Sequence, residues 1–231
     1  MDDNFPIWTP LSEDISSSNL SSFQEFVSSK TGRNFQNYGA LHHWSVNELS
    51  EFWECVALFF KINFSRPYSY ILRSKKPFYK SEWFGNSMLS YVKHIERNFK
   101  ANENAILYRN EMQEDTCITW NSLFLKSSEI KNQLLNQGVK KGDCVVGYLS
   151  NHPITIAAFL ATNSIGAVWS CCSPDFGIES VISRLRQLKP VILIAIKEYS
   201  YNGKKYFLSH RIGSIKKSIP TIKTILYFET D

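Results

Sequence analysis

The sequence predicts an α/β protein in which a helical N-terminal region precedes the first β-α-β units of a mainly parallel sheet. In residues 1–100, apolar side chains recur at the i, i+3, i+4 spacing of amphipathic helices. From residue 101 onward, short apolar runs alternate with helical segments, the order typical of β-α-β units. These runs are apolar throughout, as expected for strands covered by helices on both faces. We therefore expect two regions, 1–100 and 101–231.

The N-terminal region contains two segments with a clear apolar face. In Asn19–Ser28 and in Ser45–Phe60 the apolar residues fall on one side of a helix. Ser45 is a favourable N-cap, and Glu48 three residues later completes a capping box. We interpret the aromatic stripe of the second segment as core packing.

The second region predicts several elements in alternation. Strands are expected at Ala105–Tyr108, Val145–Leu149, Ala167–Cys171, Val191–Ile196 and Thr224–Phe228. Helices are expected from Thr119 to Leu134, from Pro153 onward and at Ile178–Leu188. Gly138 ends the first of these helices, and Ser150 or Asn151 caps the second.

Composition excludes several classes of protein. A hydrophobic fraction of 43% is too high for a disordered chain. No stretch approaches the roughly 20 apolar residues of a membrane helix, and no signal peptide opens the sequence. We expect a cytoplasmic protein with reduced thiols and no membrane partner. The five cysteines and five histidines form no ligand motif, so no metal site is predicted.

The net charge of +5 is unevenly distributed. Between Arg184 and Lys223 the only acidic residue is Glu198, against ten lysines and arginines. This stretch is either a solvated basic face or a surface for a polyanionic ligand such as a phosphorylated cofactor. No nucleic-acid recognition motif accompanies it, so we expect no nucleic-acid partner.

Two loops should lie at the carboxyl edge of the predicted sheet, where ligands bind in open parallel sheets. Ser173–Gly177 leads into a helix N-terminus, which can bind an anion; alternatively it is an ordinary turn with Asp175 as helix cap. Tyr199–Lys205 offers aromatic faces for a base and ammonium groups for phosphate; alternatively it is a solvated turn. The glycines form no nucleotide phosphate loop, and no catalytic set can be argued from spacing.

A series of short motifs runs through the chain. In order they are Leu41–Val46, Glu51–Trp53, Phe59–Phe60, Trp83–Gly85, Gly138–Asp143, Gly147–Asn151, Ser164–Gly177 and Tyr201–Lys204. The series resembles acyl-CoA synthetases of the acetyl and acetoacetyl type. The motif Trp-Ser-x-x-Ser-Pro-Asp-Phe-Gly, which begins at Trp169, resembles that of the acetoacetyl-CoA synthetase branch.

This resemblance implies a truncated adenylate-forming fold. Residues 1–100 would be the N-terminal cap, and residues 101–231 the first part of the AMP-binding domain. The implied reaction joins acetoacetate, ATP and CoA to give acetoacetyl-CoA, AMP and pyrophosphate, with Mg²⁺ offsetting phosphate charge.

By the same resemblance, Ser173, Pro174, Asp175 and Lys204 fall on positions that bind CoA, with Lys204 pairing with a CoA phosphate. The phosphate loop, the Mg²⁺ ligands and the adenylation lysine would follow Asp231. We therefore predict no catalytic residue and no activity for the 231 residues alone, and assign them no bound cofactor. The alternative is a non-catalytic truncated family member that binds CoA or a full-length paralogue. The sequence does not indicate an oligomeric state.

Overall fold

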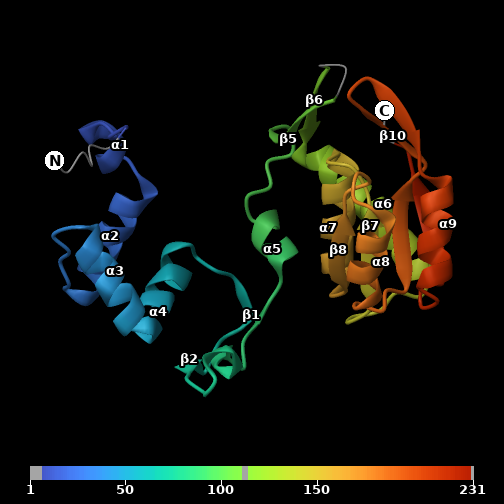
Figure 1. The fold of residues 1–231 in the computed structure, drawn as a ribbon. Helices are drawn as coiled ribbons and strands as arrows, with labels where there is room; N and C mark the ends of the chain where they lie inside the picture. The colour runs from blue at the N-terminus through green and yellow to red at the C-terminus, as the bar shows by residue number, and fades with distance from the viewer. Residues whose placement is uncertain (1–6, 111–113, 230–231) are drawn as a thin grey trace, which may run out of the picture. The chain divides into compact units, whose positions relative to one another are not determined.

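The structure, a computed structural model, describes residues 7–110 and 114–229 (Figure 1). The chain divides into two compact units, Met1–Leu89 and Ser90–Asp231.

Unit 1 contains four helices, a 3₁₀ turn and two short antiparallel strand pairs within its described residues. The helices are α1 (Ser12–Ser16), α2 (Asn19–Thr31), α3 (Tyr38–Asn47) and α4 (Leu49–Phe59), and the turn is η1 (Phe78–Lys80). The strands are β1 (Phe64–Arg66) with β4 (Met88–Leu89), and β2 (Tyr70–Arg73) with β3 (Glu82–Gly85). The helix predicted at Asn19–Ser28 is confirmed as α2, whose N-cap is Ser18.

The prediction of one helix over Ser45–Phe60 is wrong, because the backbone breaks at Glu48 between α3 and α4. Ser45 lies inside α3 and donates to the His42 carbonyl at 2.8 Å, so it caps nothing. The break lets two helices cross where one would have continued. Trp44 of α3 and Phe52 of α4 meet edge to face, with ring centroids 5.6 Å apart.

Part of the aromatic stripe forms the core of unit 1, as interpreted. Trp44 is buried with Phe23 and Leu41, and Phe52 packs against this cluster. Trp53 and Phe60, by contrast, are 39% and 49% exposed. The predicted apolar face is therefore only partly correct: Phe52 and Val56 pack against the core, whereas the fully buried residues of α4 are Cys55 and Ala57.

Unit 2 is built on the predicted parallel sheet. Its elements are α5 (Tyr91–Glu96), β5 (Asn104–Arg109), β6 (Asp115–Thr119), α6 (Trp120–Asn136), β7 (Cys144–Tyr148), α7 (Pro153–Ile165), β8 (Val168–Cys172), α8 (Ile178–Arg186), β9 (Ile192–Ile196), β10 (Glu198–Tyr201), β11 (Lys204–Phe207), α9 (Ser209–Ser218) and β12 (Thr224–Phe228). Four parallel strands lie in the order β12-β9-β7-β8, and two antiparallel hairpins, β5–β6 and β10–β11, accompany them. The α/β fold class is confirmed.

Helices cover both faces of this sheet. The connection from β7 to β8 and the return from β8 to β9 run in opposite directions along the sheet. Because parallel crossovers are right-handed, α7 lies on one face and α8 on the other. The packing agrees, since α6 contacts α7 whereas α8 contacts α9 (Figure 1). All five residues of β7 and of β9 are buried, which accounts for their continuous apolar sequence.

The ends of the helices follow the predictions only in part. Thr119 caps α6, and Gly138 follows that helix with φ +78°, as a C-terminal stop requires. The cap of α7 is His152, not Ser150 or Asn151. The His152 Nδ1 accepts from the Ile154 amide at 3.2 Å, because the ring reaches the position that a shorter side chain usually fills.

A substitution at Gly147 tests the packing of β7. A Cβ there would lie 2.9 Å from Trp169 Cη2 and 3.1 Å from Cys171 Cβ. We expect Gly147→Ala to destabilise the protein by about 1–3 kcal/mol, through overpacking. In α9, a Cβ on Gly213 meets nothing within 4 Å, so Gly213→Ala should leave stability unchanged or raise it. Urea unfolding midpoints measure both; equal midpoints for the two variants would contradict the packing of Trp169 on β7.

Candidate functional site

The topology of unit 2 has a switch point at the carboxyl ends of β7 and β9, and we call this edge of the sheet, with the loops that follow β7, β8 and β9, the crevice. The chain leaves β7 through α7 toward β8 and leaves β9 through α9 toward β12, so the strand order reverses between the neighbouring strands β7 and β9. Ligands of open α/β sheets bind at such a point. The register sets Tyr148 beside Cys172 at the two strand ends. The loop that follows β8, Ser173–Gly177, therefore lies at this edge.

Two hydrogen-bond donors hold this loop through a single backbone carbonyl. The Tyr148 hydroxyl donates to the Pro174 carbonyl oxygen at 3.0 Å, and Arg211 Nη1 of α9 donates to the same oxygen at 2.7 Å. Tyr148 is fully buried. Pro174 is buried too, whereas Ser173 is half-buried and Asp175 is exposed. Pro174 thus anchors the loop, and Asp175 presents its carboxylate to solvent.

The alternative role of Asp175 as a helix cap is wrong. The N-cap of α8 is Gly177, and no side chain caps this helix by a hydrogen bond. The loop closes instead through its own backbone, where the Phe176 amide donates to the Ser173 carbonyl at 3.3 Å. Arg184 of α8 lies over the Phe176 ring, 4.9 Å from its centroid. A second guanidinium, in addition to that of Arg211, therefore borders the loop.

The second predicted loop is a β-hairpin. Tyr199–Lys205 forms most of β10 and β11, joined by Asn202 and Gly203, whose φ values are +49° and +70°. Two consecutive residues with positive φ form the two-residue turn that best matches strand twist. The sequence did not predict these two strands, because they are short and mostly exposed and so have no continuous apolar run.

The hairpin uses some of its predicted binding groups internally. Tyr199 stacks on Tyr206, with ring centroids 5.2 Å apart, and Lys205 pairs with Glu198 at 2.9 Å. Lys204 is exposed and has no acidic partner in the part of the chain that the structure describes. Of the two lysines, Lys204 is the one free to meet a ligand.

The structure brings the two loops to the same edge but does not join all the predicted residues. The first strand of the hairpin, β10, follows β9, which borders β7 on the side opposite to β8. Tyr199, at the start of the hairpin, lies close enough to Asp175 and Arg211 to interact electrostatically with both. Lys204 lies at the far end of the hairpin, beside the turn.

Two residues of this site, Tyr148 and Arg211, were missed by sequence reasoning. Tyr148 ends an apolar strand and looked like core, and Arg211 was one cation among ten. The hydrogen bond with Tyr148 raises the pKa of Arg211, and burial raises the pKa of Tyr199. Arg211 therefore stays charged and Tyr199 neutral near pH 7, which leaves a positive charge at the base of the crevice.

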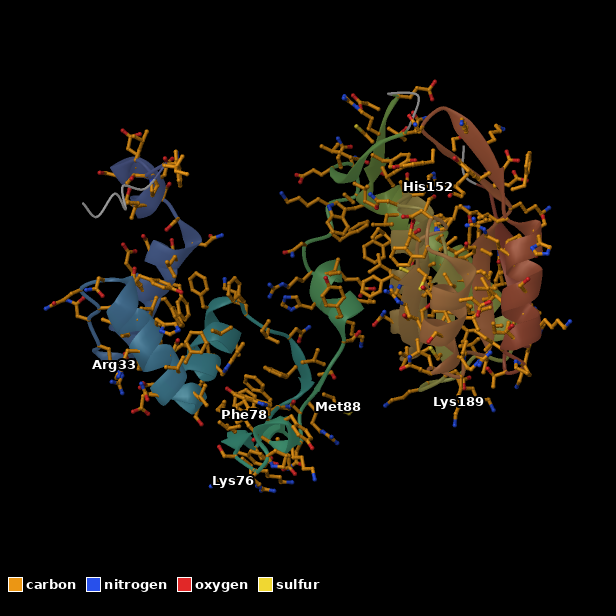
Figure 2. All side chains as sticks on the ribbon, in the orientation of Figure 1. Arg33, Lys76, Phe78, Met88, His152 and Lys189 are labelled. Carbon is orange, nitrogen blue, oxygen red and sulfur yellow. The ribbon has the colours of Figure 1, made fainter. Side chains whose placement is uncertain are left out.

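The basic stretch between Arg184 and Lys223 is not one surface. Arg184 and Arg211 border the crevice, as described above. Lys189 and Lys223 precede β9 and β12 and so lie at the amino edge, where Lys223 N donates to Val191 O at 2.8 Å. Figure 2 shows His152 and Lys189 at opposite ends of unit 2. Only part of the basic stretch can meet a ligand in the crevice.

Among the described residues, no three His, Cys, Asp or Glu side chains gather as a metal site. Within residues 7–110 and 114–229, no helix combines the length and apolar character needed to cross a bilayer.

Comparison with known proteins adds the family. The family model described as AMP-binding enzyme matches residues 95–230. The chain belongs to the AMP-binding enzyme family. Its match begins in α5 and takes in the whole parallel sheet with the loop Ser173–Gly177 and the β10–β11 hairpin.

The relatives carry a more specific name. The acetoacetyl-CoA synthetase of Macaca fascicularis is 33% identical over 223 residues, covering 95% of this chain and 33% of that protein. The acetoacetyl-coenzyme A synthetase of Rhizobium meliloti is 32% identical over 219 residues, covering 94% and 33%. The structure of acetoacetyl-CoA synthetase from Streptomyces lividans matches with a TM-score of 0.91 at 33% identity, covering 98% of this chain and 36% of that one. The chain thus spans about a third of the length of these relatives.

Proposed function

We propose that this chain forms the N-terminal part of an acetoacetate–CoA ligase. The reaction would join acetoacetate, ATP and CoA to give acetoacetyl-CoA, AMP and pyrophosphate. The observation that carries the proposal is 33% identity to an acetoacetyl-CoA synthetase over 223 residues, which cover 95% of this chain. Activation through AMP has a physical reason, because AMP is a far better leaving group than the hydroxide of a free carboxylic acid.

Within that enzyme, residues 1–100 would act as the N-terminal cap and residues 101–231 as the first part of the AMP-binding domain. We place the protein in the cytoplasm, with acetoacetate and CoA as its small-molecule partners and with no nucleic-acid partner. ATP and Mg²⁺ would be bound by the complete enzyme. The described residues offer no carboxylate cluster that fits Mg²⁺, and we assign no step of adenylate formation to them.

The contribution of this part would be to bind CoA at the carboxyl edge of the sheet. Ser173 supplies a hydroxyl and Asp175 a carboxylate on the loop, while Pro174 fixes the course of the backbone between them. Lys204, exposed and without an acidic partner among the described residues, would pair with a CoA phosphate. Arg184 and Arg211 add positive charge near the loop.

Charge reversal at Lys204 tests the coenzyme site. We expect the 231-residue chain to bind CoA, and Lys204→Glu to raise the dissociation constant about tenfold or more, since a charge-assisted phosphate contact is lost. Isothermal titration calorimetry with CoA measures this. The matched control is Lys217→Glu in the last turn of α9, which is exposed and should leave CoA affinity within about twofold. If both variants weaken CoA binding equally, the effect is due to net charge alone and the assignment of Lys204 to the site is contradicted.

The size of the natural product separates the ligase from its alternative, a non-catalytic family member that binds CoA or a full-length paralogue. We expect an antibody against residues 7–89 to detect a band of more than twice the 26.7 kDa of this chain. That product should form AMP in an acetoacetate-dependent assay, and the 231 residues alone should form none. A single band at 26.7 kDa, with no AMP formed, would favour the non-catalytic alternative.

A further inference from the structure

The loop Ser173–Gly177 depends on a side chain that lies outside the family motif. Arg211 is 37 residues beyond Pro174, on α9, yet its Nη1 donates to the Pro174 carbonyl at 2.7 Å. The same Nη1 lies 3.5 Å from the Tyr148 hydroxyl oxygen. The Tyr148 hydroxyl donates to that carbonyl as well, at 3.0 Å. A single buried backbone oxygen therefore receives two donors from two different elements.

The chemistry of the three groups makes this contact a strong one. A carbonyl oxygen has two lone pairs, so both donors can be accommodated. Pro174 is buried, and an unsatisfied buried acceptor is costly. The Arg211 guanidinium is always charged, so its hydrogen bond is charge-assisted and stronger than that of the hydroxyl. Arg211 is thus the main donor that holds the loop.

Among the described residues, no carboxylate forms an ion pair with the Arg211 guanidinium, so its positive charge is not neutralised by a partner. Tyr199, at the start of the hairpin, lies within electrostatic range of both Arg211 and Asp175. Arg211 therefore stands between α9, the crevice loop and the first strand of the hairpin.

We propose that Arg211 is a positioning residue, which fixes the crevice loop through the Pro174 carbonyl and so keeps Ser173 and Asp175 in place for the ligand. The part of this proposal that concerns CoA rests on the proposed function. The part that concerns the loop does not, because the contacts are present without any ligand.

Hydrogen–deuterium exchange on the 231-residue chain without ligand tests the positioning role. The reporter is the Phe176 amide, whose bond to the Ser173 carbonyl closes the loop. Arg211→Met keeps the length of the stem but removes every donor, and should speed exchange at Phe176 about tenfold. Arg211→Lys restores a charged donor and should return exchange to within about threefold of the wild type.

The matched control is Arg186→Met. Arg186 also donates to a backbone carbonyl, that of Ser218 at 3.3 Å, but lies at the end of α8 away from the crevice. It should leave Phe176 exchange unchanged, with a melting midpoint similar to that of Arg211→Met. Unchanged exchange in Arg211→Met, or equal acceleration in Arg186→Met, would overturn the proposal.

A CoA titration of the same variants separates this proposal from the proposed function. If wild type binds CoA, Arg211→Met should weaken binding at least fivefold and Arg211→Lys should recover most of the loss. CoA affinity that stays unchanged while the loop exchanges faster would overturn the link to the ligand. If the wild type binds no CoA, but the Phe176 amide of Arg211→Met still exchanges faster than that of the wild type, the positioning role is upheld and the coenzyme assignment is overturned.

Discussion

The pairing of β7 with β8 on one side and β9 on the other is the interaction on which the rest of unit 2 depends. It aligns Tyr148 with Cys172 and with Ala195, so the ends of three strands reach one edge together. All five residues of β7 are buried, so neither face of this strand is turned to solvent. Gly147 permits the close approach of Trp169 from the neighbouring strand. The loops that follow these strands lie at one edge because the strands end in register.

The same parallel arrangement decides which charges can act together. In a parallel sheet, residues just after strands lie at one edge and residues just before strands lie at the other. The cations of residues 184–223 are continuous in sequence but are divided between these edges. Arg211 reaches the crevice, whereas Lys189 and Lys223 lie at the far end of the unit. A basic stretch in sequence is therefore a poor measure of a basic surface in an α/β protein.

The sequence was most informative where burial is complete. Val191–Ile196 is apolar throughout because both sheet faces are covered, and the structure has β9 there. It was least informative where strands are short, polar and exposed, as in β6 and the β10–β11 hairpin, since these have neither a continuous apolar run nor a buried face. The predicted N-cap at Ser45 was wrong for a related reason. Ser45 has the right chemistry for a cap, but tertiary packing of Trp44 on Phe52 moved the helix break to Glu48.

The site shows the same limit in its functional residues. The family motif identified the loop that contains Ser173, Pro174 and Asp175, because the wording of a loop is local and can be compared. The groups that hold this loop are 26 and 37 residues away, on β7 and α9. Tyr148 falls in the motif Gly147–Asn151, which indicated a unit of the sheet rather than a site, and Arg211 lies outside the motif series. Tyr148 looks like core because it is core, and only its hydroxyl serves the loop. Since the Pro174 carbonyl is a backbone group, no side-chain pattern at position 174 can reveal its partners. Only the fold reveals these partners. Through Tyr148 and Arg211, the shape of a surface loop depends on the buried centre of the sheet.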